Sequence, residues 1–302
     1  MFMREFTPHV ERPIADPARP MQGVERIGRF GMSGLDDGLM GVALLAGSAN
    51  VIMQLARPGV GYGVAESRVI SGRADVHPIK RARTTFTYLA VAGRGTDAQK
   101  AAYRKAVNGA HAQVRSVETS PVEYNAFDRD LQLWVAACLY KGSVDIYRMF
   151  VGELDGPDAE RHYREGMTLG TTLQVRPEMW PADRAAFDEY WERSLDQLHI
   201  DDTIREYLMP VAAFRPGRHR LPGLLGQRAD EAGIFLTAGF LPQRFRDEMG
   251  FEWDDRKQRR FDAVIAALRT GNSLLPPVLR RFPFNVLLWD LDRRIKAGKP
   301  LV

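Results

Sequence analysis

The chain has 302 residues, of which 45% are hydrophobic, 26% charged and 10% aromatic, values that are ordinary for a folded globular protein. This length is enough to bury a core that encloses a cofactor. Lys and Arg total 42 against 38 Asp and Glu, a formal net charge of +4, without a lysine-rich tract or an aromatic-interleaved basic stripe. Nucleic-acid binding is therefore poorly supported. The single cysteine, Cys138, excludes an internal disulfide and a multi-cysteine metal site.

Residues 1–33 are rich in Pro, Gly and Arg and predict an extended N-terminal arm. The first twenty residues include acids and prolines and lack the apolar centre of a secretory signal. We therefore expect a cytoplasmic location by default.

An apolar segment from Leu39 to Ala56 has about the length of a short membrane span. Ser48, Asn50 and Gln54 interrupt it. A helix that is apolar on nearly all sides is usually the central core helix of a globular protein. The segment therefore predicts such a helix and no transmembrane span, while peripheral contact with a membrane stays open.

Glycine follows this segment at positions 59, 61 and 63, after Arg57-Pro58. The pattern predicts the end of the helix, a flexible connection and a tight turn that lets helices approach closely. It does not predict a phosphate-binding loop, because it follows a helix and no βαβ unit surrounds it.

Capping residues and helical spacings of apolar residues predict helices along most of the remaining chain. The expected helices cover about 77–92, 96–117, 128–150, 157–173, 183–198, 254–269 and 276–294, with another that begins at 201. A Pro/Gly-rich break at 215–223 marks at most a subdomain seam. Because strand signals are nearly absent, the sequence predicts an all-α fold, one domain of about ten helices over 34–302, able to enclose a cofactor pocket.

The histidines are the best candidates for chemistry: His9, His77, His111, His162, His199 and His219. No two stand three or four residues apart and no HExxH pattern occurs, so a metal site built from several imidazoles is disfavoured. Charged neighbours predict surface or helix-end positions for His162 and His199.

His111 stands in a different setting, predicted to be mid-helix between Ala110 and Ala112 and close to an apolar stripe that includes Val107. Small neighbours leave room for a flat group, and haem needs only one protein ligand because the porphyrin supplies four. From the residues alone, a core histidine bonded to a carbonyl or carboxylate is the stronger interpretation, and an iron ligand is the alternative.

Arg81 and Thr85 share one face of a predicted helix, which Leu89 continues. An Arg and a Thr that point inward together can hold an anion or polarise bound oxygen. Arg81 could equally neutralise a haem propionate or pair with a buried carboxylate, whereas Lys80 and Arg83 fit a solvated basic turn.

Several short motifs follow one another in a specific order. They are Gln54-Leu-Ala-Arg-Pro58, Gly63-Val64, Arg81-x-x-x-Thr85, His111-x-x-Val114-Arg115, Leu131-Gln-Leu-Trp134-Val135, Asp145-x-Tyr147 and Phe240-Leu-Pro242. Their order and spacing over about residues 35–290 resemble the MpaB/latex-clearing-protein family of oxygenases, which includes the rubber oxygenases.

The resemblance implies a helical fold around a b-type haem, with His111 as the proximal iron ligand and Arg81 and Thr85 on the distal, oxygen-binding side. We also expect Arg115 and Trp134, which lie in the same motifs, to contact the haem. Members of the family use dioxygen to cleave polyisoprene or a prenyl chain. The resemblance thus implies a haem-dependent oxygenase with a hydrophobic, unsaturated or prenyl substrate; the alternatives are a non-catalytic haem sensor or carrier and a cofactor-free helical binding protein.

Three positions depart from the family pattern. Arg57 and Ala136 stand where the family often has histidine, and Thr84 replaces a lysine of the rubber-degrading members. The change at Thr84 bears on polyisoprene cleavage, and the change at Ala136 bears on the identity of the iron ligand. The identity of the substrate and the oligomeric state do not follow from the sequence.

Overall fold

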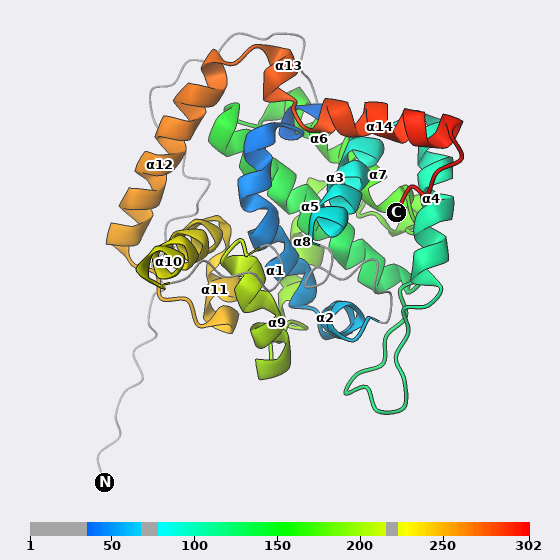
Figure 1. Ribbon diagram of the computed structural model, residues 1–302, viewed down its shortest axis with the longest axis horizontal. Helices are drawn as coiled ribbons and strands as arrows, with labels where there is room; N and C mark the ends of the chain where they lie inside the picture. The colour runs from blue at the N-terminus through cyan, green and yellow to red at the C-terminus, as the bar shows by residue number, and fades with distance from the viewer. Residues whose placement is uncertain (1–34, 68–77, 216–222) are drawn as a thin grey trace.

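The computed structural model describes residues 35–67, 78–215 and 223–302, which fold into helices α1 to α14 and short 3-10 turns (Figure 1). Within these ranges no strand forms, and Arg115 and Asn125 make one isolated antiparallel bridge. The prediction of an all-α fold is confirmed. The expected N-terminal arm and most of the break at 215–223 lie outside the described residues.

Helix α1 (Gly47–Leu55) lies at the centre of the molecule, surrounded by α2 (Pro58–Ala65), α5 (Arg129–Phe150), α9 (Asp202–Ala212) and α10 (Gly223–Phe240) (Figure 1). Its apolar side chains are buried, which confirms the predicted core helix. The first part of the apolar segment forms a separate 3-10 turn, Gly41–Ala46. No helix of the described ranges is long and apolar enough to cross a membrane.

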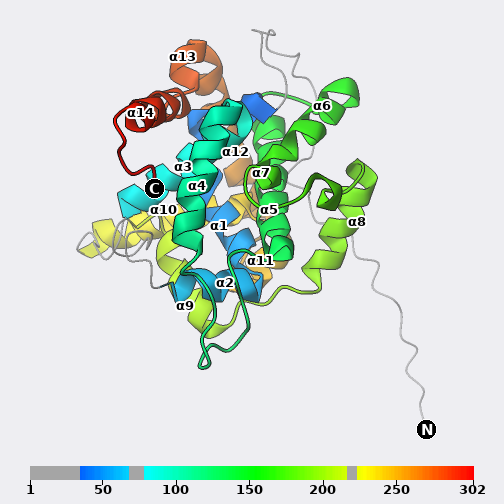
Figure 2. The same ribbon diagram turned by 90° about the vertical axis from the view of Figure 1, so that its right-hand side faces the viewer.

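Helices α3 (Pro78–Arg94) and α4 (Asp97–His111) form a hairpin on one side of the core (Figure 2). A capping box between Thr96 and Gln99 starts α4. The Tyr103 hydroxyl donates to the Thr84 carbonyl at 2.6 Å and fixes the two helices side by side. Because the hairpin is antiparallel, the start of α3 lies beside the end of α4, and this arrangement positions the candidate site.

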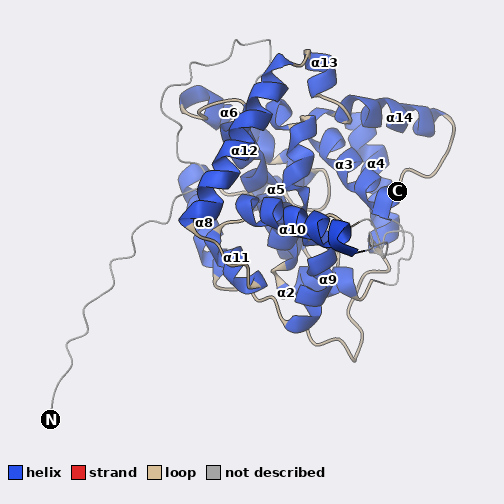
Figure 3. Cartoon of the chain, turned by 60° about the vertical axis from the view of Figure 1, so that its left-hand side comes forward, coloured by secondary structure: helices blue, strands red, loops and turns tan. Residues whose placement is uncertain are grey.

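The other helices surround the core, and all the regular elements drawn for the described residues are helices (Figure 3). They are α6 (Gly156–Gly166), α7 (Thr168–Thr171), α8 (Arg184–Leu195), α11 (Gln243–Met249), α12 (Asp255–Leu274), α13 (Pro277–Arg280) and α14 (Phe284–Lys296). The helix starts predicted at 128, 183, 201 and 254 are confirmed. At each of them an aspartate, Asp128, Asp183, Asp201 or Asp254, accepts hydrogen bonds from backbone amides of α5, α8, α9 or α12.

Two local predictions are wrong. Helix α4 ends at His111 instead of about Val117, where the chain turns into a loop that pairs with itself, since the Ala126 amide donates to the Val114 carbonyl at 2.9 Å. Asn108 and Gly109, both weak helix formers, precede this end.

The glycines after Pro58 form helix α2 rather than a flexible turn, because proline at the first helical position favours a helix start. The predicted close approach is nevertheless confirmed. A Cβ added to Gly61 would lie 2.6 Å from the Leu55 carbonyl oxygen, a distance that real side chains do not tolerate.

Candidate functional site

His111 is the last residue of α4, and its side chain is partly buried. The edge of its ring faces Phe127, with 6.3 Å between ring centroids and 79° between planes. Its Nδ1 atom is enclosed and has no hydrogen-bond partner. The carbonyl or carboxylate that the core-histidine interpretation requires is therefore not found at this nitrogen.

Arg81 lies near His111, on the first turn of α3. Burial, and in second place the positive charge of Arg81, lower the pKa of His111 to about 4. The imidazole is thus neutral at pH 7 and keeps a lone pair on one ring nitrogen. The structure therefore brings together two of the residues that the sequence selected, a neutral imidazole and a cation.

Thr85 follows Arg81 by one helical turn and is partly buried, whereas Arg81 is exposed. The two residues are one turn apart on the helix as predicted, but Arg81 does not point into the core. Its neighbour Thr84 donates from its hydroxyl to the Lys80 carbonyl, at 2.9 Å. This back-bond to the helix occupies the hydroxyl at the position where rubber-degrading members have lysine.

The other two candidates lie in different surroundings. Arg115 is exposed in the loop after α4, where it forms the bridge with Asn125. Trp134 is fully buried in α5 and stacks on Trp191, with 5.2 Å between ring centroids. Its Nε1 donates to the Gln54 carbonyl on α1 at 3.1 Å. Trp134 thus ties α5 to the central helix, while the aromatic contact of His111 is with Phe127.

Ala136, at the position where the family often has histidine, is 1% exposed. It packs against Gly170 so closely that a Cβ added to that glycine would lie 3.2 Å from the Ala136 Cβ. The space that a larger side chain would need at position 136 is therefore already filled by neighbouring residues. In this chain Ala136 is part of the core.

A chain of amide side chains lies one turn before His111, and sequence reasoning did not predict it. Gln132 donates to the Gln174 side chain at 2.7 Å, and Gln174 donates to the side chain of Asn108 on α4. These bonds join α4 and α5 through the segment that follows α7. They fix the last turn of α4, and with it the position of His111.

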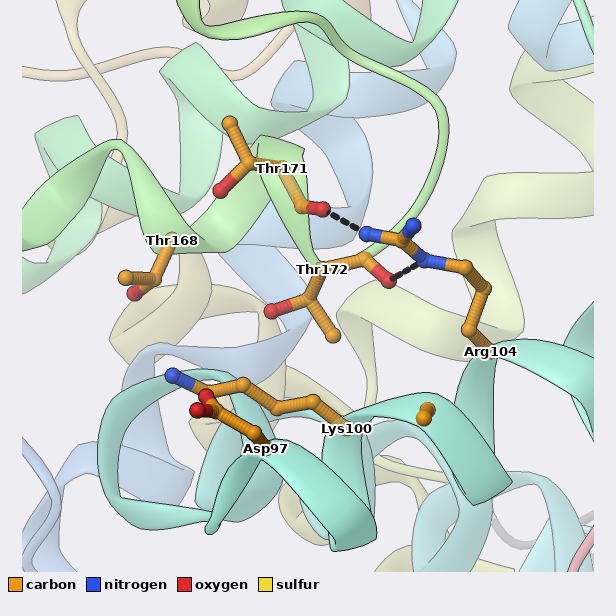
Figure 4. A pocket seen from close by; sticks show the side chains of 7 residues that line it. Asp97, Lys100, Arg104, Thr168, Thr171 and Thr172 are labelled. Carbon is orange, nitrogen blue, oxygen red and sulfur yellow. Dashed lines mark hydrogen bonds between the residues drawn. The ribbon is translucent and has the colours of Figure 1, made fainter.

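A polar pocket of about 330 Å³ lies along the first half of α4 (Figure 4). Its lining residues are Asp97, Lys100, Ala101, Arg104, Thr168, Thr171 and Thr172. Arg104 closes one side by donating to the backbone carbonyls of Thr171 and Thr172 (Figure 4). Charges of both signs suit this pocket to water or a small polar molecule, and His111 is not among its lining residues.

The remaining histidines do not add to the site. The predicted surface position of His162 is wrong, because the face of α6 that carries it packs inward and buries it completely; its Nε2 lies 2.9 Å from the Ser143 hydroxyl. His199 is exposed as predicted. His9, His77 and His219 lie outside the described residues. Within the described ranges no three His, Cys, Asp or Glu residues are grouped so that they could hold a metal ion.

Comparison with known proteins places this geometry in a family. Residues 37–270 match the model of the ER-bound oxygenase mpaB/B'/rubber oxygenase catalytic domain. Two relatives, Uncharacterized protein Mb2261 of Mycobacterium bovis and Uncharacterized protein Rv2237 of Mycobacterium tuberculosis, are each 50% identical over 259 residues, 86% of this chain and all of theirs. No solved structure matches the chain. The match covers the core helices, the Arg81 to His111 hairpin and most of α12, so the chain belongs to the mpaB/rubber oxygenase catalytic-domain family.

Proposed function

We propose that the chain is a b-type haem-dependent oxygenase in which His111 is the iron ligand. One observation carries the proposal: a neutral imidazole with an unpartnered, enclosed nitrogen lies beside a cation, in a chain of an oxygenase family. A buried ring nitrogen without a hydrogen-bond partner calls for a ligand that the structure does not contain, and a bound metal is one such ligand.

The residues present fit a haem. Its iron needs one protein ligand, and His111 offers a ring nitrogen that carries no proton at neutral pH. Arg81 is exposed beside it and can pair with a propionate carboxylate, for which a guanidinium is well suited. Arg115 supplies a second exposed cation four residues after His111. When bound, haem supplies the iron that reacts with dioxygen.

The protein's own residues then have defined tasks. The low pKa of His111 keeps its lone pair available down to mildly acidic pH. As the alternative to pairing with a propionate, Arg81 would place a fixed positive charge beside the bound group, and Thr85 would offer a hydroxyl donor from the same helix face. Trp134, stacked on Trp191 and bonded to Gln54, is a rigid part of the core that joins α5 to α1.

We propose a hydrophobic substrate, unsaturated or prenylated, because the family includes rubber oxygenases. The polar pocket along α4 is lined by charged residues and does not suit a hydrocarbon. Thr84 replaces the lysine of rubber-degrading members, so we expect the substrate to differ from polyisoprene. Dioxygen is the co-substrate.

The test is the visible spectrum of the full chain expressed with a haem precursor. We expect a Soret band in the wild type, its loss in His111→Ala, and its retention in His199→Ala, which removes an exposed histidine. Circular dichroism shows whether each variant is folded. A folded wild-type protein without bound haem would overturn the proposal, and so would a band that survives in His111→Ala.

Oxygen consumption by the haem-loaded protein with prenyl lipids and olefins then tests catalysis. We expect turnover with at least one of them, and a tenfold or greater loss in Arg81→Ala without loss of the Soret band. A haem-loaded protein that consumes no oxygen with any of these substrates would instead be a sensor or carrier.

A further inference from the structure

Exposed apolar side chains are concentrated in the C-terminal part of the described chain. Of the 14 large hydrophobic residues that are exposed in the described ranges, eight lie between 274 and 295. They are Leu274, Leu275, Val278, Leu279, Phe282, Val286, Trp289 and Ile295. We call the first seven of these residues, over 274–289, the apolar edge. They lie at the end of α12, on α13 and on the first part of α14, which share the same upper edge of the molecule in all three views (Figures 1, 2 and 3).

Helix α14 has two apolar faces, and only one of them packs against other helices of the described chain. Phe284 and Leu291 are buried against α3 and α4, with Leu287 and Leu288 packed beside them. Val286 and Trp289 are 45% and 64% exposed. A helix that serves only as a surface layer needs one apolar face, so the outer pair is not explained by packing within the described chain.

The apolar edge is attached to the core rather than loosely placed. The backbone of Phe282 lies so close to Gly41 that a Cβ there would be 2.6 Å from the Phe282 carbonyl oxygen. Arg280 donates to the carbonyls of Ser273 and Leu275 at 3.1 and 3.0 Å and fixes the turn between α12 and α13. The exposed side chains of this edge are therefore presented by a fixed backbone.

Positive charge accompanies these residues. Residues 271–302 contain six Arg and Lys and two Asp, a net charge of +4, which equals the net charge of the whole chain. The other 270 residues therefore have no net charge between them. The cations Arg293 and Lys296 are exposed on α14, and the Arg293 guanidinium lies over the Trp289 ring, 5.7 Å from its centroid.

We infer that the apolar edge docks on an anionic membrane surface, with its side chains among the lipid chains and its cations at the headgroups. Leucine, phenylalanine and tryptophan beside arginine and lysine are the composition of interfacial membrane-binding segments. A second copy of the chain is a poorer occupant, because two such faces would bring like charges together. The inference does not depend on haem.

The test measures binding of the full chain to vesicles of phosphatidylglycerol and phosphatidylcholine, and to vesicles of phosphatidylcholine alone. We expect co-sedimentation with the anionic vesicles that weakens at high salt, and little with the neutral ones. Among the five tryptophans, Trp134, Trp180 and Trp191 are buried, Trp253 is partly buried and Trp289 is exposed. We therefore expect a blue shift of the emission on vesicles that disappears in Trp289→Phe.

Variants test whether the apolar edge is the surface that binds the membrane. Trp289→Glu is expected to weaken anionic-vesicle binding tenfold or more, and the pair Lys296→Gln and Lys299→Gln to weaken it about 25-fold, from about fivefold per cation. Leu225→Glu is the matched control, because Leu225 is 69% exposed but lies on α10. Equal loss in Leu225→Glu would overturn the inference, as would failure of the folded wild type to bind anionic vesicles. A dimer that Trp289→Glu converts to a monomer, without vesicle binding, would instead assign this edge to self-association.

Discussion

The positive charge of Arg81 on α3 acts on the imidazole of His111 at the end of α4, and with burial it holds the pKa of His111 near 4. In the haem-free protein we expect Arg81→Ala to raise this pKa toward the ordinary value of about 6.5, because loss of a nearby cation makes protonation easier. Titration of the His111 ring protons by NMR measures the change. Burial remains in the variant, so the rise is expected to be partial.

Arg83→Ala is the matched control for this experiment. Arg83 lies two residues further along α3, and its guanidinium pairs with Asp290 of α14 at 3.7 Å. We expect the His111 titration to be unchanged in this variant. An equal rise in both variants would mean that a general loosening of α3, and not the charge of Arg81, controls the imidazole.

The same pKa predicts how the haem-free protein responds to acid. The pKa of His111 is lower in the folded chain than in the unfolded chain, so the unfolded chain takes up a proton first as the pH falls. This contribution to the free energy of unfolding is complete above about pH 6.5 and is lost between about pH 6.5 and 4. Urea unfolding midpoints at pH 7, 6 and 5 are expected to fall less in His111→Asn than in the wild type, while the exposed-site control His199→Asn follows the wild type.

Much of the fold could be predicted because local chemistry determines it. Asp128 and Asp183 cap helices as expected, and the apolar run before Pro58 becomes the central helix α1. The errors occur where tertiary contacts override local preference. Burial of the inner face of α6 takes His162 into the core, although its sequence neighbours are charged.

The site was predictable only in part, for a physical reason. Arg81 and His111 are 30 residues apart, and only the antiparallel packing of α3 on α4 makes them neighbours. Motif order pointed to both residues, but helical periodicity did not reveal that the Nδ1 of His111 has no partner. The amides of Gln132 and Gln174 were missed because their pairing depends on the fold and follows no periodic pattern.

Ala136→His tests whether the family's histidine could act in this chain. Ala136 is 1% exposed and packs on Gly170, so an imidazole there is expected to overpack the core and to bury a polar ring. We expect a loss of about 1–3 kcal/mol in the free energy of unfolding, measured by urea denaturation. Ala136→Ser adds only one heavy atom, so we expect a smaller loss in the free energy of unfolding. A stable Ala136→His protein that binds haem after His111→Ala would show that position 136, and not 111, offers the better ligand site.

Asp290 joins α14 to α3 by pairing with Arg83, and we expect its contribution to the free energy of unfolding to depend on pH. Hydrogen bonds from Arg293 and Arg294 hold the pKa of this carboxylate below its usual value. Because the folded pKa is depressed, the stabilisation is present above about pH 4 and is lost as the pH falls through the folded value. We expect Asp290→Asn to lower the melting temperature at pH 7 and to make little difference below pH 3. Asp188→Asn, which removes an exposed carboxylate on α8, is the control, and an equal effect there would point to net charge instead.

Two glycines give a paired test of the packing. Gly239 of α10 lies against Phe261, and an added Cβ would clash with the ring, so Gly239→Ala is expected to destabilise the protein by about 1–3 kcal/mol. Gly109 is exposed within α4 with nothing within 4 Å of an added Cβ. Gly109→Ala should therefore stabilise the protein by about 0.5–1 kcal/mol, because alanine favours the helix. Urea denaturation measures both, and destabilisation by Gly109→Ala would mean that another group occupies the space beside His111.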